Sequence, residues 1–393
     1  MSRAIIWFRN DQRLADNSAL TSALARHTEV LPVLIIDPQQ QGPSPFGFER
    51  LGRYRAQFLH ETGSDLDAQL RAKGSALLVR QGDPASVLLE LTAGWNAHVV
   101  YAQRLYAWEE QEHERRVSEA VDLHLHDTNT LLHPDDLPFA IRHLPHVFTA
   151  FRTQVEKRLT VRDVLPEPTH MPTPREWLAL ADMQPAVEHT PPPRDARAVM
   201  SFTGGRAAAL DRLKHYFWDT RALTTYKETR NGLLGADYSS KFSPWLATGA
   251  LSSREVYHAV KRYEADHGAN ESTYWLLYEL LWRDFFQFIA GKHGVDLFKR
   301  SGIAHRPHRG NRDAQRFAAW CEGRTGQAFI DANMRELAAT GWMSNRGRQN
   351  VASYLVHELG LDWRMGAGWF ERSLIDHDPC SNCCAWCMSN RST

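Results

Sequence analysis

The stretch "AIIWFRNDQRLADNSALTSALARHTEVLPVLII" (residues 4–36) contains two short apolar runs, at 4–8 and 30–36, on either side of a helical pattern near 17–27. Runs that are apolar at every position are typical of strands buried on both faces of a parallel sheet. Two such strands joined by a helix form a βαβ unit. This stretch therefore predicts an α/β domain.

The same alternation continues to about residue 130. Further candidate strands are "ALLVR" (76–80), "HVVYA" (98–102) and the weaker "LHLH" (123–126), and helical patterns lie near 49–73, 84–95 and 109–121. Strands that alternate with helices indicate a doubly wound parallel sheet, which we assign to residues 1–130. The first strand is not followed by G-x-G-x-x-G, so we do not expect an ordinary dinucleotide site there.

The rest of the chain changes character twice. Proline-rich stretches at 165–174 and 190–194 cannot sustain a helix or a central strand, and they predict that residues 131–204 form a linker wrapped over the surface. From residue 205 to 393 the pattern is helical almost throughout, with caps such as Ser252 and Asn270 or Ser272. We therefore expect a second, all-α domain.

Composition narrows the class of protein. The chain has 393 residues, 43% of them hydrophobic and 23% charged, with a formal net charge of +0. These values predict a folded protein whose net charge does not attract polyanions. A surface that binds nucleic acid therefore has to be a local patch. The basic stretch 292–316 could be such a patch or a solvated loop. The sequence shows neither a signal peptide nor an apolar stretch of membrane length, so we expect a cytoplasmic protein.

Four of the five cysteines lie in "DHDPCSNCCAWCMSNRST" (376–393). The C-x-x-C-C-x-x-C spacing favours a metal or an iron–sulfur cluster. However, a tetrahedral site needs four converging ligands, and the stretch has neither a histidine cluster nor a second C-x-x-C hairpin beside it. We therefore predict no metal, and keep a metal or iron–sulfur protein as the weaker alternative.

Three polar patterns in the helical half are candidates for chemistry. Glu279, Trp282, Arg283 and Phe286 share one helix face, which indicates either a local Glu279–Arg283 pair or a polar ligand. Asn345, Arg348 and Gln349 occupy i, i+3 and i+4 at a helix start. The hydroxyls of Ser239, Ser240 and Ser243 precede a helix, where they could form a phosphate cradle or a serine-rich N-cap.

Together these patterns resemble the photolyase/cryptochrome family, and most closely its DASH-type cryptochromes. The resemblance covers nearly the whole chain and rests on long motifs: "IIWFRNDQRLADN", "YRAQFLHET", "VFTAFRTQVE", "DYSSKFSPWLATGALS", "YWLLYELLWRDFF", "TGQAFIDANMRELAATGWMSNRGRQNVASYL" and "LGLDWRMGAGWFERSLIDHD". Within them, "SSKFSPWL" and "MSNRGRQNVASYL" indicate the DASH branch. The resemblance implies an α/β domain followed by a helical domain that binds FAD.

The resemblance also implies the cofactor ligands. The serine loop would hold the FAD phosphates, and other residues would line the flavin, with Asn382 facing its reactive nitrogen; the predicted set is Tyr226, Ser239, Ser240, Lys241, Phe242, Ser243, Arg348, Asp376, Asp378 and Asn382. A buried arginine beside an anionic flavin is reasonable, because an unpaired buried anion is costly. A folate, 5,10-methenyltetrahydrofolate, is a possible second chromophore, with Glu109 as its acidic contact.

The implied reaction is the light-driven repair of cyclobutane pyrimidine dimers by a deoxyribodipyrimidine photo-lyase acting as a monomer. The substrate face would consist of Glu279, Trp282, Asn345 and Gln349, with Arg230 and Arg283 on phosphates. A dimer within a duplex must be flipped out of the stack before an enzyme can act on it. The resemblance to the DASH branch therefore implies a preference for single-stranded DNA as the substrate. The alternative is a blue-light signalling flavoprotein with little or no repair.

Two features depart from the family pattern. The implied electron path runs through Trp386 and Trp363, but Gly310 stands at the outer position, and Trp320 would have to serve instead. We expect impaired photoreduction. Near the end, Met388 replaces an aromatic residue, and the sequence stops at Thr393 where the family continues. We expect a natural short form or a truncated reading, with weakened FAD binding.

Overall fold

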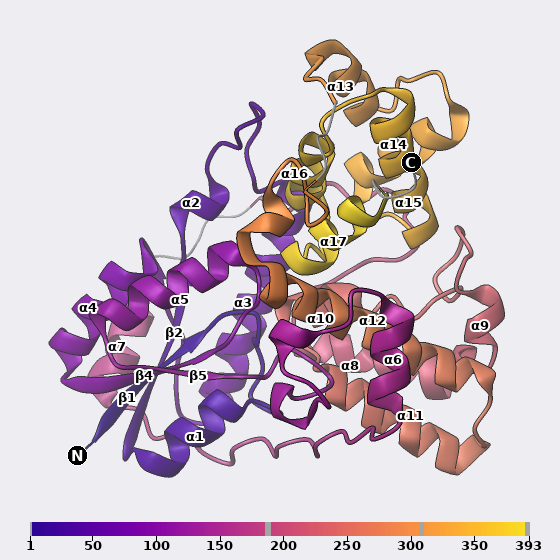
Figure 1. Ribbon diagram of the computed structural model, residues 1–393. Coiled ribbons are helices and arrows are strands. Elements are labelled where there is room, and N and C mark those ends of the chain that lie inside the picture. Colours follow the sequence, from indigo (N-terminus) through magenta and orange to yellow (C-terminus); the bar gives the residue numbers. More distant parts are fainter. Residues whose placement is uncertain (1, 185–189, 306–309, 390–393) are drawn as a thin grey trace.

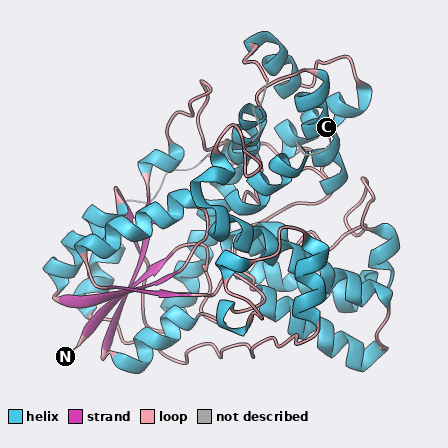
Figure 2. Cartoon of the chain, in the orientation of Figure 1, coloured by secondary structure: helices cyan, strands magenta, loops and turns pink. Residues whose placement is uncertain are grey.

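A computed structural model describes residues 2–184, 190–305 and 310–389, except the side chains of residues 385 and 387–389. All strands lie at one end of the molecule, and helices make up the other end (Figure 2). The five strands form a parallel sheet in the order β3-β2-β1-β4-β5, and they span Arg3–Phe8 (β1), Glu29–Ile36 (β2), Leu78–Gln81 (β3), Ala97–Gln103 (β4) and Leu123–His126 (β5). The predicted parallel sheet is confirmed.

Helices cover both faces of this sheet (Figure 1). Alternate residues of β1 point to opposite faces, as the period of a strand requires. Ala4, Ile6 and Phe8 pack with α1 (Ser18–Arg26) and α3 (Arg53–Ala72), whereas Ile5 and Trp7 pack with α4 (Pro84–Trp95) and α5 (Trp108–Ala120). A short α2 (Pro38–Gln41) follows β2. The α/β half is therefore doubly wound, as predicted.

The other half is helical, as expected. Its helices are α8 (Arg206–Lys214), α9 (Tyr226–Thr229), α10 (Ser243–Thr248), α11 (Ser253–His267), α12 (Glu271–His293), α13 (Ala314–Cys321), α14 (Ala328–Thr340), α15 (Asn345–Ser353), α16 (Trp363–Ser373) and α17 (Pro379–Ser389). α12 is the longest described helix, with 23 residues, and it runs through the core. The Asn270 side chain caps it by accepting a hydrogen bond from the Thr273 backbone N–H at 2.9 Å. None of the described helices is long and apolar enough to cross a lipid bilayer.

The segment 131–204 differs from the linker that we expected. It includes α6 (Phe148–Glu156) and α7 (Arg175–Met183). Phe148 and Phe151 of α6 are buried in the core of the helical half, and Trp177 of α7 is buried against one face of the sheet. The proline-rich stretch 165–174 forms no helix, in line with the prediction. The apolar residues on either side of it are helical because they contribute to the two cores.

The helical half closes against the carboxyl end of β1. Gly249 has a φ of +72°, and a Cβ atom there would lie 2.0 Å from the Asn10 carbonyl oxygen. Only glycine allows this close approach. Nearby, the Arg254 guanidinium lies 2.8 Å from the buried Asp16 carboxylate. These contacts set the helical residues against the carboxyl edge of the sheet.

Candidate cofactor and substrate site

A buried carboxylate joins three of the predicted cofactor residues. The Asp376 Oδ2 atom accepts hydrogen bonds from Ser243 Oγ at 2.7 Å and from Arg348 Nη2 at 2.9 Å. These residues come from α10, α15 and the loop before α17, so only the tertiary fold brings them together. The other carboxylate oxygen, Oδ1, is buried and has no hydrogen-bond partner. A buried unpaired acceptor of this kind fits a donor supplied by a ligand.

Arg212 of α8 holds the serine loop, residues 236–243, in place through hydrogen bonds. Its guanidinium donates hydrogen bonds to the carbonyl oxygens of Ala236, Ser239 and Ser240 at 3.0–3.1 Å and to the Asp237 carboxylate at 2.7 Å. Sequence reasoning missed Arg212, because the position of an arginine on a helix does not show which distant residues it bonds to. The hydroxyls of Ser239 and Ser240 make no hydrogen bond to the described residues. The loop is therefore shaped by the protein, while its hydroxyls remain available to phosphates.

Two other residues of the loop turn inward. The Lys241 Nζ atom donates hydrogen bonds to the carbonyl oxygens of Gly235 and Ala236 at 3.2 and 2.8 Å, and it lies 3.3 Å from the centre of the Tyr238 ring. Burial lowers the pKa of Lys241 to about 7. Phe242 packs in the core against Tyr216. Phe242 is therefore a packing residue in this structure, and Lys241 is a cation held by backbone dipoles.

Two residues of the predicted substrate face, Glu279 and Trp282, lie on α12, where the local Glu279–Arg283 pair is not formed. Glu279 instead accepts a hydrogen bond from Arg230 Nη1, on the loop after α9. Burial raises the pKa of Glu279, and the Arg230 charge opposes this rise. Tyr226 lies close to the same pair, and burial raises its pKa as well. The structure thus joins two predicted substrate residues through a contact that the sequence pattern did not specify.

Arg283, which was predicted to contact a DNA phosphate, makes hydrogen bonds within the protein. Its guanidinium donates hydrogen bonds to the side chain of Asn129 at 2.6 Å and to the Leu246 carbonyl oxygen at 3.1 Å. These bonds link α12 to the loop after β5 and to α10. The Arg283 side chain is therefore bound inside the protein, because it extends from α12 into the contact between the two halves.

Trp282 stacks face to face on Phe148 of α6. The ring centres are 3.7 Å apart and the rings are 11° from parallel. Asn345 and Gln349 lie exposed on α15, and Gln349 Oε1 accepts a hydrogen bond from Arg346 Nη1 at 2.9 Å. Arg346 also donates to Asn231 at 2.9 Å, next to Arg230. Arg346, which sequence reasoning missed, connects the two parts of the predicted substrate face.

The start of α17 fixes two predicted flavin residues. Asp378 accepts hydrogen bonds from the Ser381 backbone N–H at 2.6 Å and from Gln287 Nε2 at 2.8 Å. The Asn382 amide donates to the Ala367 carbonyl oxygen at 3.0 Å and accepts from Trp386 Nε1 at 3.1 Å. These bonds orient the Asn382 amide.

The cysteines of α17 are interleaved with these residues. Cys380, Cys383 and Cys384 are buried thiols, and burial raises the pKa of Cys380 well above its usual range. In the described part of the chain, no three histidine, cysteine or acidic side chains are arranged to hold a metal ion. The side chains of Cys387 and Met388 lie outside the described residues.

The tryptophans are arranged differently from the predicted path. Trp320 is 0% exposed, so it cannot be an outer, solvent-facing member. Its ring centre is instead 6.5 Å from that of the inner Trp386, with Phe370 beside both rings. Trp363 is also buried, and its Nε1 atom donates to the Arg300 carbonyl oxygen at 3.1 Å. Gly366 permits this packing, since a Cβ atom there would lie 2.2 Å from the Trp386 ring.

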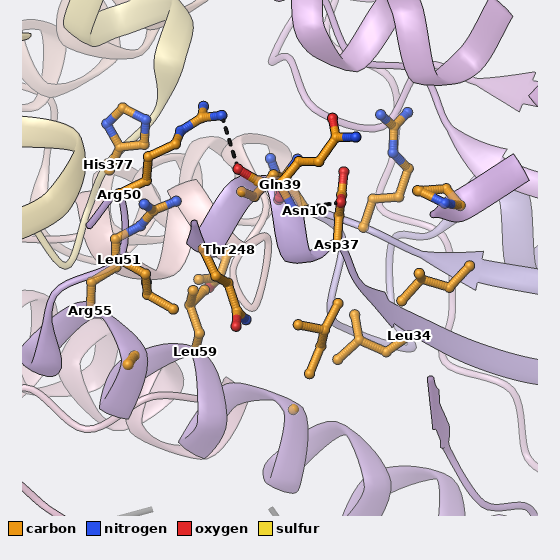
Figure 3. A pocket seen from close by; sticks show the side chains of 18 of the residues that line it. Asn10, Leu34, Asp37, Gln39, Arg50, Leu51, Arg55, Leu59, Thr248 and His377 are labelled. Carbon is orange, nitrogen blue, oxygen red and sulfur yellow. Dashed lines mark hydrogen bonds between the residues drawn. The ribbon is translucent and has the colours of Figure 1, made fainter. Parts of the chain in front are cut away.

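A large cavity of about 1630 Å³ opens at the carboxyl ends of the strands (Figure 3). Arg50, Arg55 and His377 lie on one side of it, and Asp37 lies at the end of β2 (Figure 3). Of the predicted cofactor residues, Glu109 and Asn382 line the cavity. No sequence pattern predicted this cavity, because its lining residues come from both halves of the chain.

Charged side chains in this cavity form a network that runs from exposed Glu109 to more buried groups. The Arg50 guanidinium lies 2.7 Å from the Glu109 carboxylate and 2.8 Å from that of Glu371. Burial raises the pKa of Glu110 to about 7 and lowers that of His377 well below its usual value. Glu110 Oε2 and His377 Nδ1 are buried without a hydrogen-bond partner. The cavity therefore offers both charged and unpaired polar groups to a ligand.

Comparison with known proteins gives matches over most of the chain. Residues 4–174 match the family described as DNA photolyase, and residues 275–393 match the FAD binding domain of DNA photolyase. A cryptochrome DASH from Gloeobacter violaceus is 47% identical over 392 residues, which cover 97% of this chain and 78% of the relative.

Solved structures agree with these matches. A cryptochrome from Synechocystis sp. PCC6803 superposes with a TM-score of 0.92 at 43% identity, covering 99% of this chain and 82% of that one. A bacterial class III photolyase from Agrobacterium tumefaciens superposes with a TM-score of 0.82 at 27% identity, covering 98% and 79%.

Proposed function

Because the chain belongs to the photolyase/cryptochrome family and has its FAD-binding domain, we propose that it uses blue light to split cyclobutane pyrimidine dimers, preferably in single-stranded DNA. The observation that carries the proposal is the Arg230–Glu279 pair beside Trp282 on the half-exposed face of α12. The Arg230 cation could bind a phosphate, and the Glu279 carboxyl, with its raised pKa, could bind the edge of a pyrimidine. The Trp282 indole ring could stack on the face of the dimer. The proposed activity is that of a carbon–carbon lyase.

Asp376, Arg348 and the hydroxyls of Ser239 and Ser240 are the groups that would hold FAD. Asp376 would contribute its unpaired oxygen, and Arg348 would contribute a positive charge. Asn382 presents an amide that its neighbours already orient. The chemistry that bound FAD supplies is light-driven donation of one electron to the dimer.

Arg230 and Glu279 would change partners when DNA binds. A phosphate competes with the Glu279 carboxylate for the Arg230 guanidinium, because both are anions. Without its cation, Glu279 is more easily protonated, since burial already raises its pKa. A protonated Glu279 can donate a hydrogen bond to a pyrimidine carbonyl oxygen and so stabilise negative charge on the dimer. Trp282 would stack on the dimer, and Asn345 and Gln349 would border it.

The preference for a single strand follows from the cost of base flipping. Extracting a dimer from a duplex costs a few kcal/mol of stacking and pairing, which a single strand does not require. Of the described cations next to the proposed site, Arg230 is paired with Glu279, Arg346 is hydrogen-bonded to Gln349 and Asn231, and Arg283 is bound internally. We therefore propose that few phosphate contacts are available to offset the cost of flipping from a duplex.

We also propose that the cavity of Figure 3 takes the folate antenna. Glu109, Glu110 and His377 offer polar groups there, two of them with an unpaired atom. Since Asn382 lines the same cavity, a chromophore in it would lie near the flavin-facing amide. The fluorescence of an added folate should be quenched by energy transfer to FAD. Glu109→Gln should weaken folate binding if Glu109 contacts the folate.

We expect slow or incomplete photoreduction, because both Trp320 and Trp363 are buried. Transient absorption after a blue flash measures this directly. A long-lived tryptophan radical of ordinary yield would contradict the expectation. Cys321 and Cys380 are buried thiols outside any disulfide, which agrees with the reducing cytoplasm that we propose as the compartment. We propose that the protein acts as a monomer.

Repair of an oligonucleotide with one thymine dimer tests the proposal. The purified protein, loaded with FAD and kept reduced, is given the substrate as a single strand or a duplex, in blue light or in darkness. We expect light-dependent repair that is faster on the single strand, and its loss in Glu279→Gln. A parent protein that retains FAD but repairs neither substrate would favour the alternative, a blue-light signalling protein. Equal repair by Glu279→Gln would contradict the role of this residue.

A further inference from the structure

One face of α12 remains partly exposed along several turns. Its residues recur at intervals of three and four, and they are all aromatic or charged: Tyr274, Trp275, Tyr278, Glu279, Trp282, Arg283 and Phe286. Tyr274 is 41% exposed. Eight residues separate it from Trp282, which corresponds to about 12 Å along the helix. The proposed lesion site therefore occupies only part of this face.

Ring contacts connect Trp282 to Tyr274 through α6, which packs beside α12 (Figure 1). Phe148 stacks on Trp282, and its ring meets that of Tyr278 edge-on with centres 5.1 Å apart. The Tyr278 and Tyr274 ring centres are 6.3 Å apart. These rings form a continuous row from the proposed lesion site to the protein surface.

Arg152 of α6 lies at the outer end of this row. Its guanidinium carbon is 5.4 Å from the centre of the Tyr278 ring, and its Nη1 atom is 3.5 Å from the Tyr274 hydroxyl. The Tyr274 hydroxyl donates a hydrogen bond to Glu156 at 2.7 Å. The hydroxyl edge of Tyr274 is thus held in place while much of the ring faces solvent.

We propose that Tyr274 and Arg152 form a subsite that stacks a base about three to four nucleotides from the lesion in a single DNA strand. An exposed aromatic ring beside a guanidinium is the pair of groups with which proteins bind single strands, through stacking and phosphate contacts. At a rise of about 3.4 Å per nucleotide, the distance from Trp282 spans about three to four nucleotides of a stacked strand. A duplex cannot use this subsite, because its bases stack on one another.

Glu156 limits the strength of this subsite. Its carboxylate lies 3.5 Å from the Arg152 guanidinium, so it competes with a DNA phosphate for that cation. Replacing Glu156 by glutamine removes the competing charge. The subsite therefore predicts tighter binding of single-stranded DNA by Glu156→Gln, with a salt dependence steeper by about 0.7 in the log–log slope.

The inference rests on the proposed function, and a binding experiment in darkness separates the two. Fluorescence anisotropy of the FAD-loaded protein is measured with a single-stranded twelve-mer that contains one thymine dimer. A second oligonucleotide carries abasic nucleotides about three and four positions from the dimer on both sides, the spacing that the distance of about 12 Å implies, and a third is undamaged. Tyr274→Ala is compared with Trp108→Ala, which removes an equally exposed ring (41%) from α5 in the α/β half.

We expect Tyr274→Ala to weaken binding of the first oligonucleotide about tenfold, the order expected for one lost stacked base, and to leave binding of the abasic one unchanged. Trp108→Ala should match the parent on both. Equal losses on the two oligonucleotides, or no loss on either, would overturn the subsite. A parent that binds damaged and undamaged strands alike would instead contradict the proposed function, and a parent that binds no strand would overturn both.

Discussion

Two arginine–carboxylate pairs in the helical half have opposite surroundings. In the Arg348–Asp376 pair, the Asp376 side chain is 2% exposed and also accepts a hydrogen bond from Ser243. In the Arg230–Glu279 pair, the two side chains are 25% and 33% exposed, and Arg230 is the hydrogen-bond donor to the carboxylate. The first pair is a fixed support, whereas the second can exchange its partner for a ligand. The two roles differ because Asp376 is buried and accepts hydrogen bonds from two side chains, whereas Glu279 is partly exposed and accepts one, from Arg230.

The largest expected effect is that of Asp376→Asn. This change leaves the Arg348 charge without its buried partner, and breaking such a pair typically costs about 3–5 kcal/mol. Since Arg348 keeps some exposure, we expect a loss of about 3 kcal/mol in the free energy of unfolding and a loss of FAD from the purified protein. Urea unfolding and the flavin absorbance measure the two effects.

Ser243→Ala is the matched control for this cluster. It removes one hydrogen bond to Asp376 and leaves the ion pair, so a loss of about 1 kcal/mol is expected. If Asp376→Asn were as mild as Ser243→Ala, the pair would not be the support that its burial suggests.

The next effect is that of Glu279→Gln on repair. A hydrogen bond to a charged group is worth about 1.5–3 kcal/mol, which corresponds to a loss of roughly ten- to hundredfold in the repair rate. Stability should change by less than about 1 kcal/mol, because the pair is partly exposed. Repair rates and urea unfolding of the same preparation check the contrast with Asp376→Asn. Strong destabilisation here would show that the second pair is also a support.

A third prediction concerns Lys241, a cation bound to carbonyl oxygens. Its pKa is lowered to about 7, and a bound diphosphate would raise it again. FAD binding should then take up a proton near pH 8, so that affinity is highest below pH 7 and falls by at most about tenfold per unit as the pH rises above 7. Calorimetry in buffers of different ionisation enthalpy measures the proton uptake. Lys241→Met should abolish it, and uptake that persists in this variant would contradict the assignment.

The smallest effect is expected for Arg230→Gln. Loss of one phosphate contact should lower the salt dependence of single-strand binding by about 0.7 in the log–log slope and weaken binding only several-fold at low salt. Anisotropy titrations at three salt concentrations measure both. An unchanged slope would mean that Arg230 stays with Glu279 when DNA is bound.

The sheet could be predicted from local patterns, and most of the site could not. The strands and the helices between them follow from apolar runs and helical periods that each segment carries by itself. The local Glu279–Arg283 pair was an equally simple expectation, but Arg283 bonds to Asn129, 154 residues away. Phe148 was assigned to a linker, although it stacks on Trp282. Side chains choose partners by proximity in the fold, which sequence spacing does not report.

The sequence by itself determined the fold class, the family and the identity of the groups available for chemistry. These depend on residue types and on short-range periodicity, which are properties of the chain. Only the tertiary structure decided the partners: Arg230 with Glu279, Arg348 and Ser243 with Asp376, and Trp320 beside Trp386. Ionic and hydrogen-bonding interactions act over a few ångströms, so their effect depends on which distant segments the fold brings within reach.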